Sequence, residues 1–187
     1  MGRGFSAEPL LQQGQDILYL GFSSGLSGTC QAGAMAAAEL REQYPQRKIL
    51  TVDTLAASGG EGLLLWLTLE EQRRGATLEQ AAAFAEGMKL KICHWFTVDD
   101  LEYLKRGGRV SPTVALVGGL LGIRPVMHMD DEGHLIKMFT VRGRRASLQA
   151  LVDKYGELAH EPGKTPIFIS HGDCMEDAQL LARLLKE

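Results

Sequence analysis

The sequence predicts an α/β fold, in which a Rossmann-like N-terminal part built on a parallel sheet precedes a smaller α+β domain. Two observations lead to this prediction. In the first half, short apolar runs alternate with longer helical segments, as in strand–helix–strand units around a parallel sheet. In the second half, two β-prone runs flank the turn-forming residues Asp130-Asp131-Glu132-Gly133, which is the pattern of a hairpin.

The first half contains three predicted strands, each followed by helix. The strands are expected at residues 17–21, 48–53 and 92–98. The helices are expected at residues 31–43, 55–74, 77–88 and 99–105. Thr77 with Glu79 and Gln80 marks one helix start. Gly75 and Gly107-Gly108 mark helix ends.

The pattern changes after Gly107-Gly108, where we expect a domain boundary. The predicted domains span residues 1–110, the remainder of an α/β domain, and residues 111–187, an α+β domain that is itself truncated. The second domain should contain hairpin strands at 123–129 and 134–141, helices at 113–121, 144–160 and 175–186, and a strand at 166–171. Pro112 supports the first of these helices, because Pro suits the first turn.

Charge and cysteine usage exclude several classes of protein. The formal net charge is only −3, from 20 basic and 23 acidic residues, so neither nucleic acid nor an anionic membrane is the expected main partner. The three cysteines are widely spaced and lack any C-x-x-C pair, which indicates neither a disulfide framework nor a zinc site. Residues 1–11 do not resemble a signal peptide, so we expect a soluble, cytoplasmic protein.

The hydroxyl-rich loop between the first strand and the first helix is the main candidate site. It carries Ser23, Ser24, Ser27, Gly28 and Thr29. Its hydroxyls can donate to a carboxylate or phosphate oxygen, and the first amides of the helix lack intrahelical acceptors. The alternative is that Ser27 or Thr29 only caps the helix.

Four segments together resemble the DegV-like fatty-acid-binding proteins. They are residues 22–29 (FSSGLSGT), 99–110 (DDLEYLKRGGRV), 119–126 (GLLGIRPV) and 141–146 (VRGRRA). The pair Asp53-Thr54 stands where the family usually has Asp-Ser. The change from Ser to Thr keeps the hydroxyl and adds a methyl group. The family's N-terminal strand and loop and its C-terminal His-Thr-Gly-Pro-Gly-like segment have no counterpart in this chain.

The resemblance implies a function. It implies a non-enzymatic protein that binds a long-chain fatty acid between its two domains, with the carboxylate at the Ser/Thr loop. It also implies presentation of that acid to a fatty acid kinase, with Arg109 and Arg142, which lie in matched motifs, as docking candidates. No cofactor and no metal are expected beyond the bound acid.

Two other hypotheses remain open. Gly21-Phe22-Ser23-Ser24-Gly25 has the letters of a G-x-S-x-G elbow, so a serine esterase could use Ser23 with His171 and Asp173. The chain could also be a truncated remnant that binds nothing. His94, in the third predicted strand, is interpreted as a packed histidine because no partner for base catalysis stands at a recognised spacing.

Overall fold

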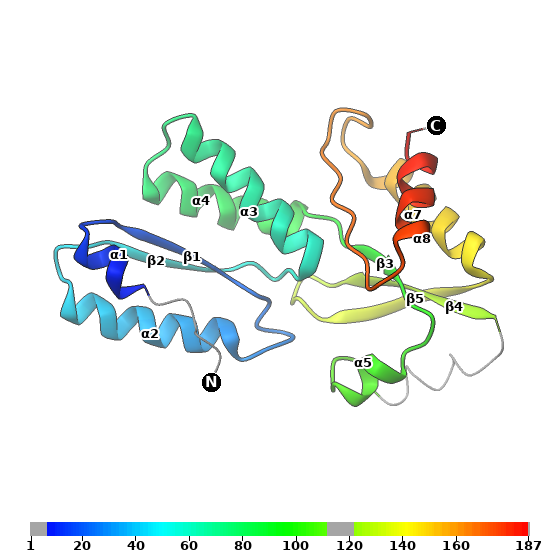
Figure 1. The fold of residues 1–187 in the computed structure, drawn as a ribbon, viewed down its shortest axis with the longest axis horizontal. Helices are drawn as coiled ribbons and strands as arrows, with labels where there is room; N and C mark the ends of the chain where they lie inside the picture. Colours follow the sequence, from blue (N-terminus) through cyan, green and yellow to red (C-terminus); the bar gives the residue numbers. More distant parts are fainter. Residues whose placement is uncertain (1–6, 112–121, 187) are drawn as a thin grey trace.

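The computed structural model describes residues 7–111 and 122–186, and its elements form two parts that follow each other along the long axis (Figure 1). The N-terminal part contains a parallel sheet of β1 (Ile17–Gly21) and β2 (Ile49–Asp53). The C-terminal part contains an antiparallel sheet in the order β3-β4-β5. The mixed architecture confirms the predicted α/β fold class.

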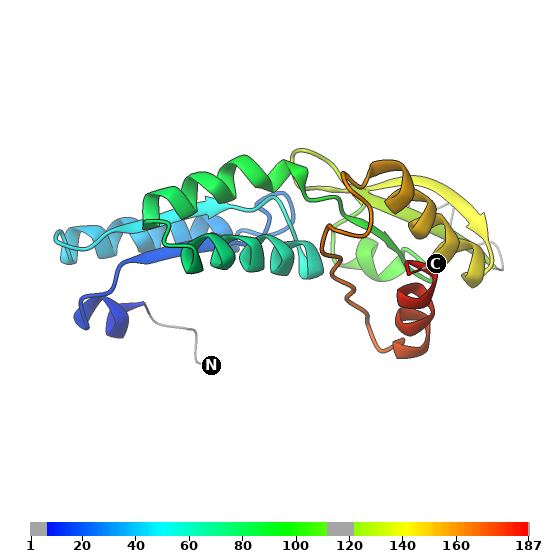
Figure 2. The ribbon, with the colours of Figure 1, turned by 90° about the horizontal axis from the view of Figure 1, so that it is seen from above.

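Helices cover both faces of the parallel sheet (Figures 1 and 2). On one face, α1 (Glu8–Gln12) and α2 (Thr29–Gln43) enclose a small core around Leu11, Ala37 and Ile49. On the other face, α3 (Ser58–Arg73) and α4 (Leu78–Met88) enclose a core that includes Val52, Leu64, Ala85 and Ile92. The sequence pattern predicted each of these helices except α1, whose five residues are too short for a recognisable period.

A capping box at Thr77 and Gln80 starts α4. The amide of Gln80 donates to the Thr77 hydroxyl over 3.3 Å, and the amide of Thr77 donates to the Gln80 side chain over 2.8 Å. Two orphan amides are thereby satisfied, which confirms the predicted helix start. A short 3₁₀ turn, η1 (Lys89–Lys91), then leads toward the second part.

The second sheet is built on the predicted hairpin. β4 (Ile123–Met129) pairs antiparallel with β5 (Leu135–Arg142), and β3 (Trp95–Thr97) pairs antiparallel with β4 on its other edge. A core of Leu101, Val110 and Met127 lies beside α5 (Glu102–Arg106). The other helices of the described residues are α7 (Arg144–Leu158), which packs on the sheet, and α8 (Met175–Leu184), which packs on α7.

Two expectations differ from the structure, and a third concerns residues that the structure does not describe. The third predicted strand, 92–98, is shorter and pairs antiparallel in the second sheet, because the direction of a strand is fixed by its partner and not by its own residues. Residues 166–171 form no strand, since no other strand of the described chain pairs with them. The helix predicted at 113–121 lies outside the described residues. The division into domains at residue 110 stays a prediction.

Within residues 7–111 and 122–186, every helix is too short or too polar to cross a bilayer.

Candidate functional site

Two loops meet at the carboxyl ends of β1 and β2. Gly21 and Asp53 are register partners at the last position of the two strands, so the chain segments that follow them leave the same edge of the sheet. This edge is where open α/β sheets place ligands. The turn of the β4–β5 hairpin reaches the same place, as the contacts of Ser23 show.

Ser23 is fully buried and its hydrogen bonds are internal. Its hydroxyl donates to the carbonyl of Gly133 in the hairpin turn over 2.8 Å and accepts from the amide of Gly25 over 3.2 Å. Its own amide donates to the carbonyl of Ala56 over 2.9 Å. Ser23 therefore joins the first loop both to the second loop and to the hairpin.

Thr54 and Asp53 hold the two loops together from the other side. The Thr54 hydroxyl, also fully buried, donates to the carbonyl of Gly21 over 2.6 Å and accepts from the amide of Ala56 over 3.2 Å. One carboxylate oxygen of Asp53 accepts from the amides of Ser24, over 3.2 Å, and Leu55, over 3.1 Å. Leu55 has a φ of 51°, so this bond supports a strained backbone position.

Backbone atoms of the loop and the hairpin turn lie unusually close. A Cβ on Gly25 would be 2.7 Å from the carbonyl oxygen of Glu132, and a Cβ on Gly133 would be 2.1 Å from the Ser23 hydroxyl oxygen. Gly133 also has a φ of 78°, which disfavours side chains. The sequence marked Gly133 only as a turn residue, so its role at this junction was missed.

The outer half of the loop, residues 26–29, faces outward. Gly28 and Thr29 are exposed and Ser27 is half-buried. The Ser27 and Thr29 hydroxyl oxygens lie 2.6 Å apart, and the amide of Thr29 donates to the Ser27 hydroxyl over 3.2 Å. The pair shares two hydroxyl hydrogens, of which one bridges the two oxygens, so the other can donate to a ligand.

The first turn of α2 adds main-chain donors beside this hydroxyl pair. The helix begins at Thr29, with Gly28 at the N-cap position. The Ser27 hydroxyl accepts from the amide of Thr29, and no side chain caps the helix amides that follow. The first amides of a helix have no intrahelical acceptor and carry the positive end of its dipole. This outer half can therefore receive an anion, although Ser27 also satisfies one amide in the manner of a cap.

The remaining predicted residues lie at different distances from this place. The Ser24 side chain is exposed at the surface of the loop. The guanidinium of Arg109 donates to the carbonyl of Leu26 over 3.1 Å, so Arg109 lies beside the outer half. Arg142 is exposed at the far end of β5, a strand of eight residues that spans about 23 Å.

The geometry gives no catalytic triad around Ser23. The Ser23 hydroxyl donates to a carbonyl, and no histidine bond to it exists in the described part of the chain. The ring of His171 accepts from the amide of Cys174 over 3.2 Å, at the start of α8. The esterase hypothesis therefore lacks the hydrogen bond between nucleophile and base that it requires.

His94 packs against the start of α3, as expected for a structural histidine. A Cβ on Gly60 would lie 1.9 Å from its Nε2, so the ring fits only because residue 60 is a glycine. Burial lowers the pKa of His94, and the nearby His128 lowers it further. The backbone carbonyl of His94 also contacts His128 Nδ1, at 2.6 Å.

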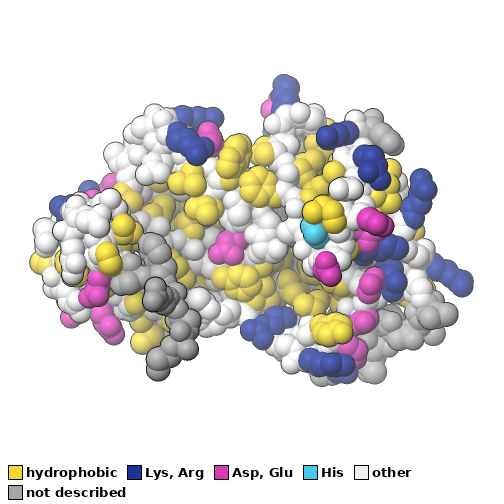
Figure 3. Space-filling model, in the orientation of Figure 1, with side chains coloured by type: hydrophobic (Ala, Val, Ile, Leu, Met, Phe, Trp, Pro, Cys, Tyr) yellow, Lys and Arg dark blue, Asp and Glu magenta, His cyan; other side chains and the backbone are white. Residues whose placement is uncertain are grey.

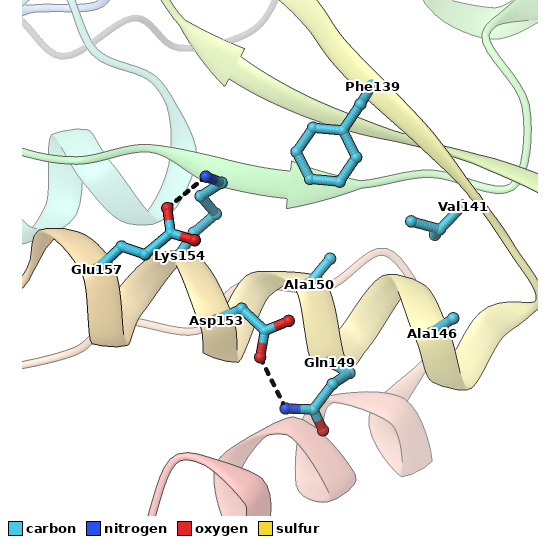
Figure 4. A pocket seen from close by; sticks show the side chains of 8 residues that line it. All are labelled: Phe139, Val141, Ala146, Gln149, Ala150, Asp153, Lys154 and Glu157. Carbon is cyan, nitrogen blue, oxygen red and sulfur yellow. Dashed lines mark hydrogen bonds and ion pairs between the residues drawn. The ribbon is translucent and has the colours of Figure 1, made fainter.

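An open groove of about 400 Å³ lies elsewhere, between β5 and α7 (Figure 4). Phe139 and Val141 point into it from the strand, and Ala146 and Ala150 face them from the helix. Its cation, Lys154, is paired with Glu157 and stands 5.3 Å over the Trp95 ring. Because this charge is already neutralised, the groove is a weaker candidate for a carboxylate than the loop.

Apolar side chains also gather between the two parts of the molecule on the face seen in Figure 3. The exposed rings of Trp66 on α3 and Phe168 in the C-terminal part lie against each other, with centroids 6.1 Å apart. Within residues 7–111 and 122–186, no group of three or more His, Cys, Asp and Glu side chains could hold a metal ion.

Comparison with known proteins identifies the family. Residues 6–187 match the family model described as "Uncharacterised protein, DegV family". The chain belongs to the DegV family. A DegV domain-containing protein of Clostridium perfringens is 42% identical over 180 residues, which cover 96% of this chain and 62% of that protein. A fatty acid-binding protein of Thermotoga maritima is 36% identical over 159 residues, which cover 84% of this chain and 53% of that protein.

A solved DegV structure has the same fold. The crystal structure of a DegV lipid binding protein from Thermotoga maritima matches with a TM-score of 0.76 at 29% identity, over 97% of this chain and 64% of that one. This DegV chain therefore spans less than two thirds of the length of these relatives.

Proposed function

We propose that this DegV chain binds a long-chain fatty acid between its two parts, with the carboxylate at the outer half of the Ser/Thr loop. The observation that supports this most is the Ser27–Thr29 hydroxyl pair, 2.6 Å apart, at the N-terminus of α2. The name of the Thermotoga relative supports the ligand class, since it is a fatty acid-binding protein.

The chemistry of the outer half suits a monoanion. A carboxylate only accepts hydrogen bonds, and the hydroxyl pair and the first amides of α2 each have a donor to offer. Hydrogen bonds to a charged group contribute about 1.5 to 3 kcal/mol each, and the helix dipole about 0.3 to 1 kcal/mol. Hydroxyls avoid the large desolvation cost of a lone buried cation when the site is empty.

Affinity would come mainly from the acyl tail. Burial of a methylene contributes about 0.8 kcal/mol, so a chain of about sixteen carbons gains roughly 11 kcal/mol before the entropy of association is subtracted. The head-group site would then set the orientation of the acid and reject an ester, which lacks the charge.

The protein partner would be a fatty acid kinase, and the two proteins would interact in the cytoplasm. The DegV chain itself would not be an enzyme. Arg109 and Arg142 are the docking candidates. Arg109 lies beside the proposed carboxylate site, whereas Arg142 is about 23 Å of strand away, so a partner that uses both must cover the length of the second sheet. Docking by arginines should weaken as salt is added.

Titration calorimetry with palmitate and methyl palmitate tests the ligand and its orientation together. The proposal expects binding of palmitate and at least tenfold weaker binding of the ester. Equal affinity for both would mean that the carboxylate makes no specific contact. No binding of either would support the hypothesis of a remnant that does not bind.

A further inference from the structure

Asp53 places a negative charge beside the proposed carboxylate site. It is the last residue of β2 and the register partner of Gly21, after which the Ser/Thr loop begins. Its carboxylate oxygen accepts the amides of Ser24 and Leu55. These two bonds fix the start of both loops, so the side chain cannot turn away without releasing them.

The charge of Asp53 reaches the first turn of α2. Cys30, the second residue of that helix, packs closely on Gly21: a Cβ added to Gly21 would lie 2.7 Å from the sulfur of Cys30. Burial raises the pKa of the Cys30 thiol, and the charge of Asp53 raises it further. Asp53 and the amides that would receive an anion therefore lie in the same small region.

We propose that Asp53 is the residue that makes this site selective for a singly charged head group, by repelling ligands in proportion to their negative charge. This inference rests on the proposed fatty acid site. Asp53 would act as a positioning residue through its hydrogen bonds and as a specificity residue through its charge.

The two roles have different consequences for different ligands. If the loop loses the position that the hydrogen bonds of Asp53 give it, the binding of every ligand that uses the loop weakens by a similar factor. Loss of the Asp53 charge strengthens the binding of anions. The gain in binding free energy is twice as large for a dianion as for a monoanion, because Coulomb energy is proportional to the charge of the ligand. A ratio of two affinities therefore separates charge from position.

Two positive charges act in the opposite direction. Arg109 lies beside Leu26, and Lys89 opposes the effect of Asp53 on Cys30. Both remain when Asp53 is changed, so they cancel in a comparison of variants.

The test is Asp53→Asn, which keeps the oxygen that accepts the two amides and removes the charge. Palmitate serves as the monoanion and hexadecyl phosphate, at pH 8, as the dianion, because the second pKa of a phosphate ester is about 6. For charges about 10 Å apart in a medium with an effective dielectric constant of about 40, between the values for a protein surface and for water, we expect about fourfold tighter binding of palmitate and about sixteenfold tighter binding of hexadecyl phosphate.

Two control variants isolate the effect. Asp53→Ala removes the charge and the hydrogen bonds, so it should lose affinity relative to Asp53→Asn for both ligands and lower the melting temperature. Asp16 is a matched control at the opposite end of the sheet, where its carboxylate accepts the amide of Lys48 over 2.9 Å. Asp16→Asn should leave the ratio of the two affinities unchanged.

The outcomes are distinct. A roughly fourfold change in the ratio with Asp53→Asn, larger at low than at high salt, supports the proposal. Palmitate binding by the wild-type protein with an unchanged ratio in Asp53→Asn would overturn the selectivity role and leave the fatty acid site intact. Failure of the wild-type protein to bind palmitate would end the proposed function and this inference together.

Discussion

The inner and outer halves of one loop contain the same kinds of residue in opposite situations. In the inner half, the Ser23 hydroxyl is fully buried and bonded to Gly133 and Gly25. In the outer half, the hydroxyls of Ser27 and Thr29 bond chiefly to each other at the surface. The inner half therefore fixes the position of the loop, and the outer half keeps a donor for a ligand. A binding loop needs both, because donors bind best when they are held in place beforehand.

The largest expected effect comes from the junction between the inner half and the hairpin. Gly133→Ala should destabilise the protein by about 3 to 5 kcal/mol, since the new Cβ would meet Ser23 and would add strain at positive φ. Gly75→Ala is the control, because Gly75 has a φ of 94° and no atom within 4 Å of the added Cβ. It should cost only about 1 to 2 kcal/mol in urea unfolding. Equal losses would show that the close contact is unimportant.

A smaller effect is expected when the inner hydroxyl alone is removed. Ser23→Ala leaves the buried Gly133 carbonyl and the Gly25 amide without this partner, which should cost about 1 to 3 kcal/mol. Urea denaturation measures the loss, and Ser27→Ala provides the outer-half comparison, with a cost below about 0.5 kcal/mol. If Ser23→Ala proved as mild as Ser27→Ala, the contrast between the halves would not hold.

The junction between the two parts should also respond to pH through His94. Because its pKa is lowered, the unfolded chain takes up a proton at higher pH than the folded chain. The stability from neutral His94 is therefore present above the ordinary histidine pKa of 6.5 and is lost as pH falls below it. Melting temperatures between pH 8 and pH 5 should fall, and His94→Gln should reduce that slope. The exposed His160 is the control: His160→Gln should leave the slope unchanged.

The smallest effect on stability should come from the outer half. Ser27→Ala combined with Thr29→Ala should change the free energy of unfolding by less than about 0.5 kcal/mol and weaken palmitate binding by about tenfold, since one charged hydrogen bond is lost. Calorimetric titration and thermal melting measure the two quantities. A large stability loss with unchanged affinity would identify both residues as helix caps.

Local signals were sufficient for most of the fold. The hairpin followed from its turn residues, and the start of α4 from Thr77 and Gln80, because these features depend on neighbours in sequence. The partner of β3 and the unpaired state of residues 166–171 depend on segments far away in the chain. No local pattern specifies them.

The candidate site divides in the same way. The sequence located the Ser/Thr loop after the first strand. It could not separate Ser23 from Ser27, because the partner that buries Ser23 is Gly133, which is 110 positions away. The contrast between the two halves of the loop is thus a tertiary property.

The central claim is that an acid binds at the outer half of the loop, and amide NMR during a palmitate titration tests it most directly. The account predicts that the amide signals of Gly28, Cys30 and Gln31 shift with palmitate and not with methyl palmitate, while that of Gly25, already bonded to Ser23, stays nearly constant. Saturable palmitate binding that leaves the amides of Gly28, Cys30 and Gln31 unmoved would contradict the account.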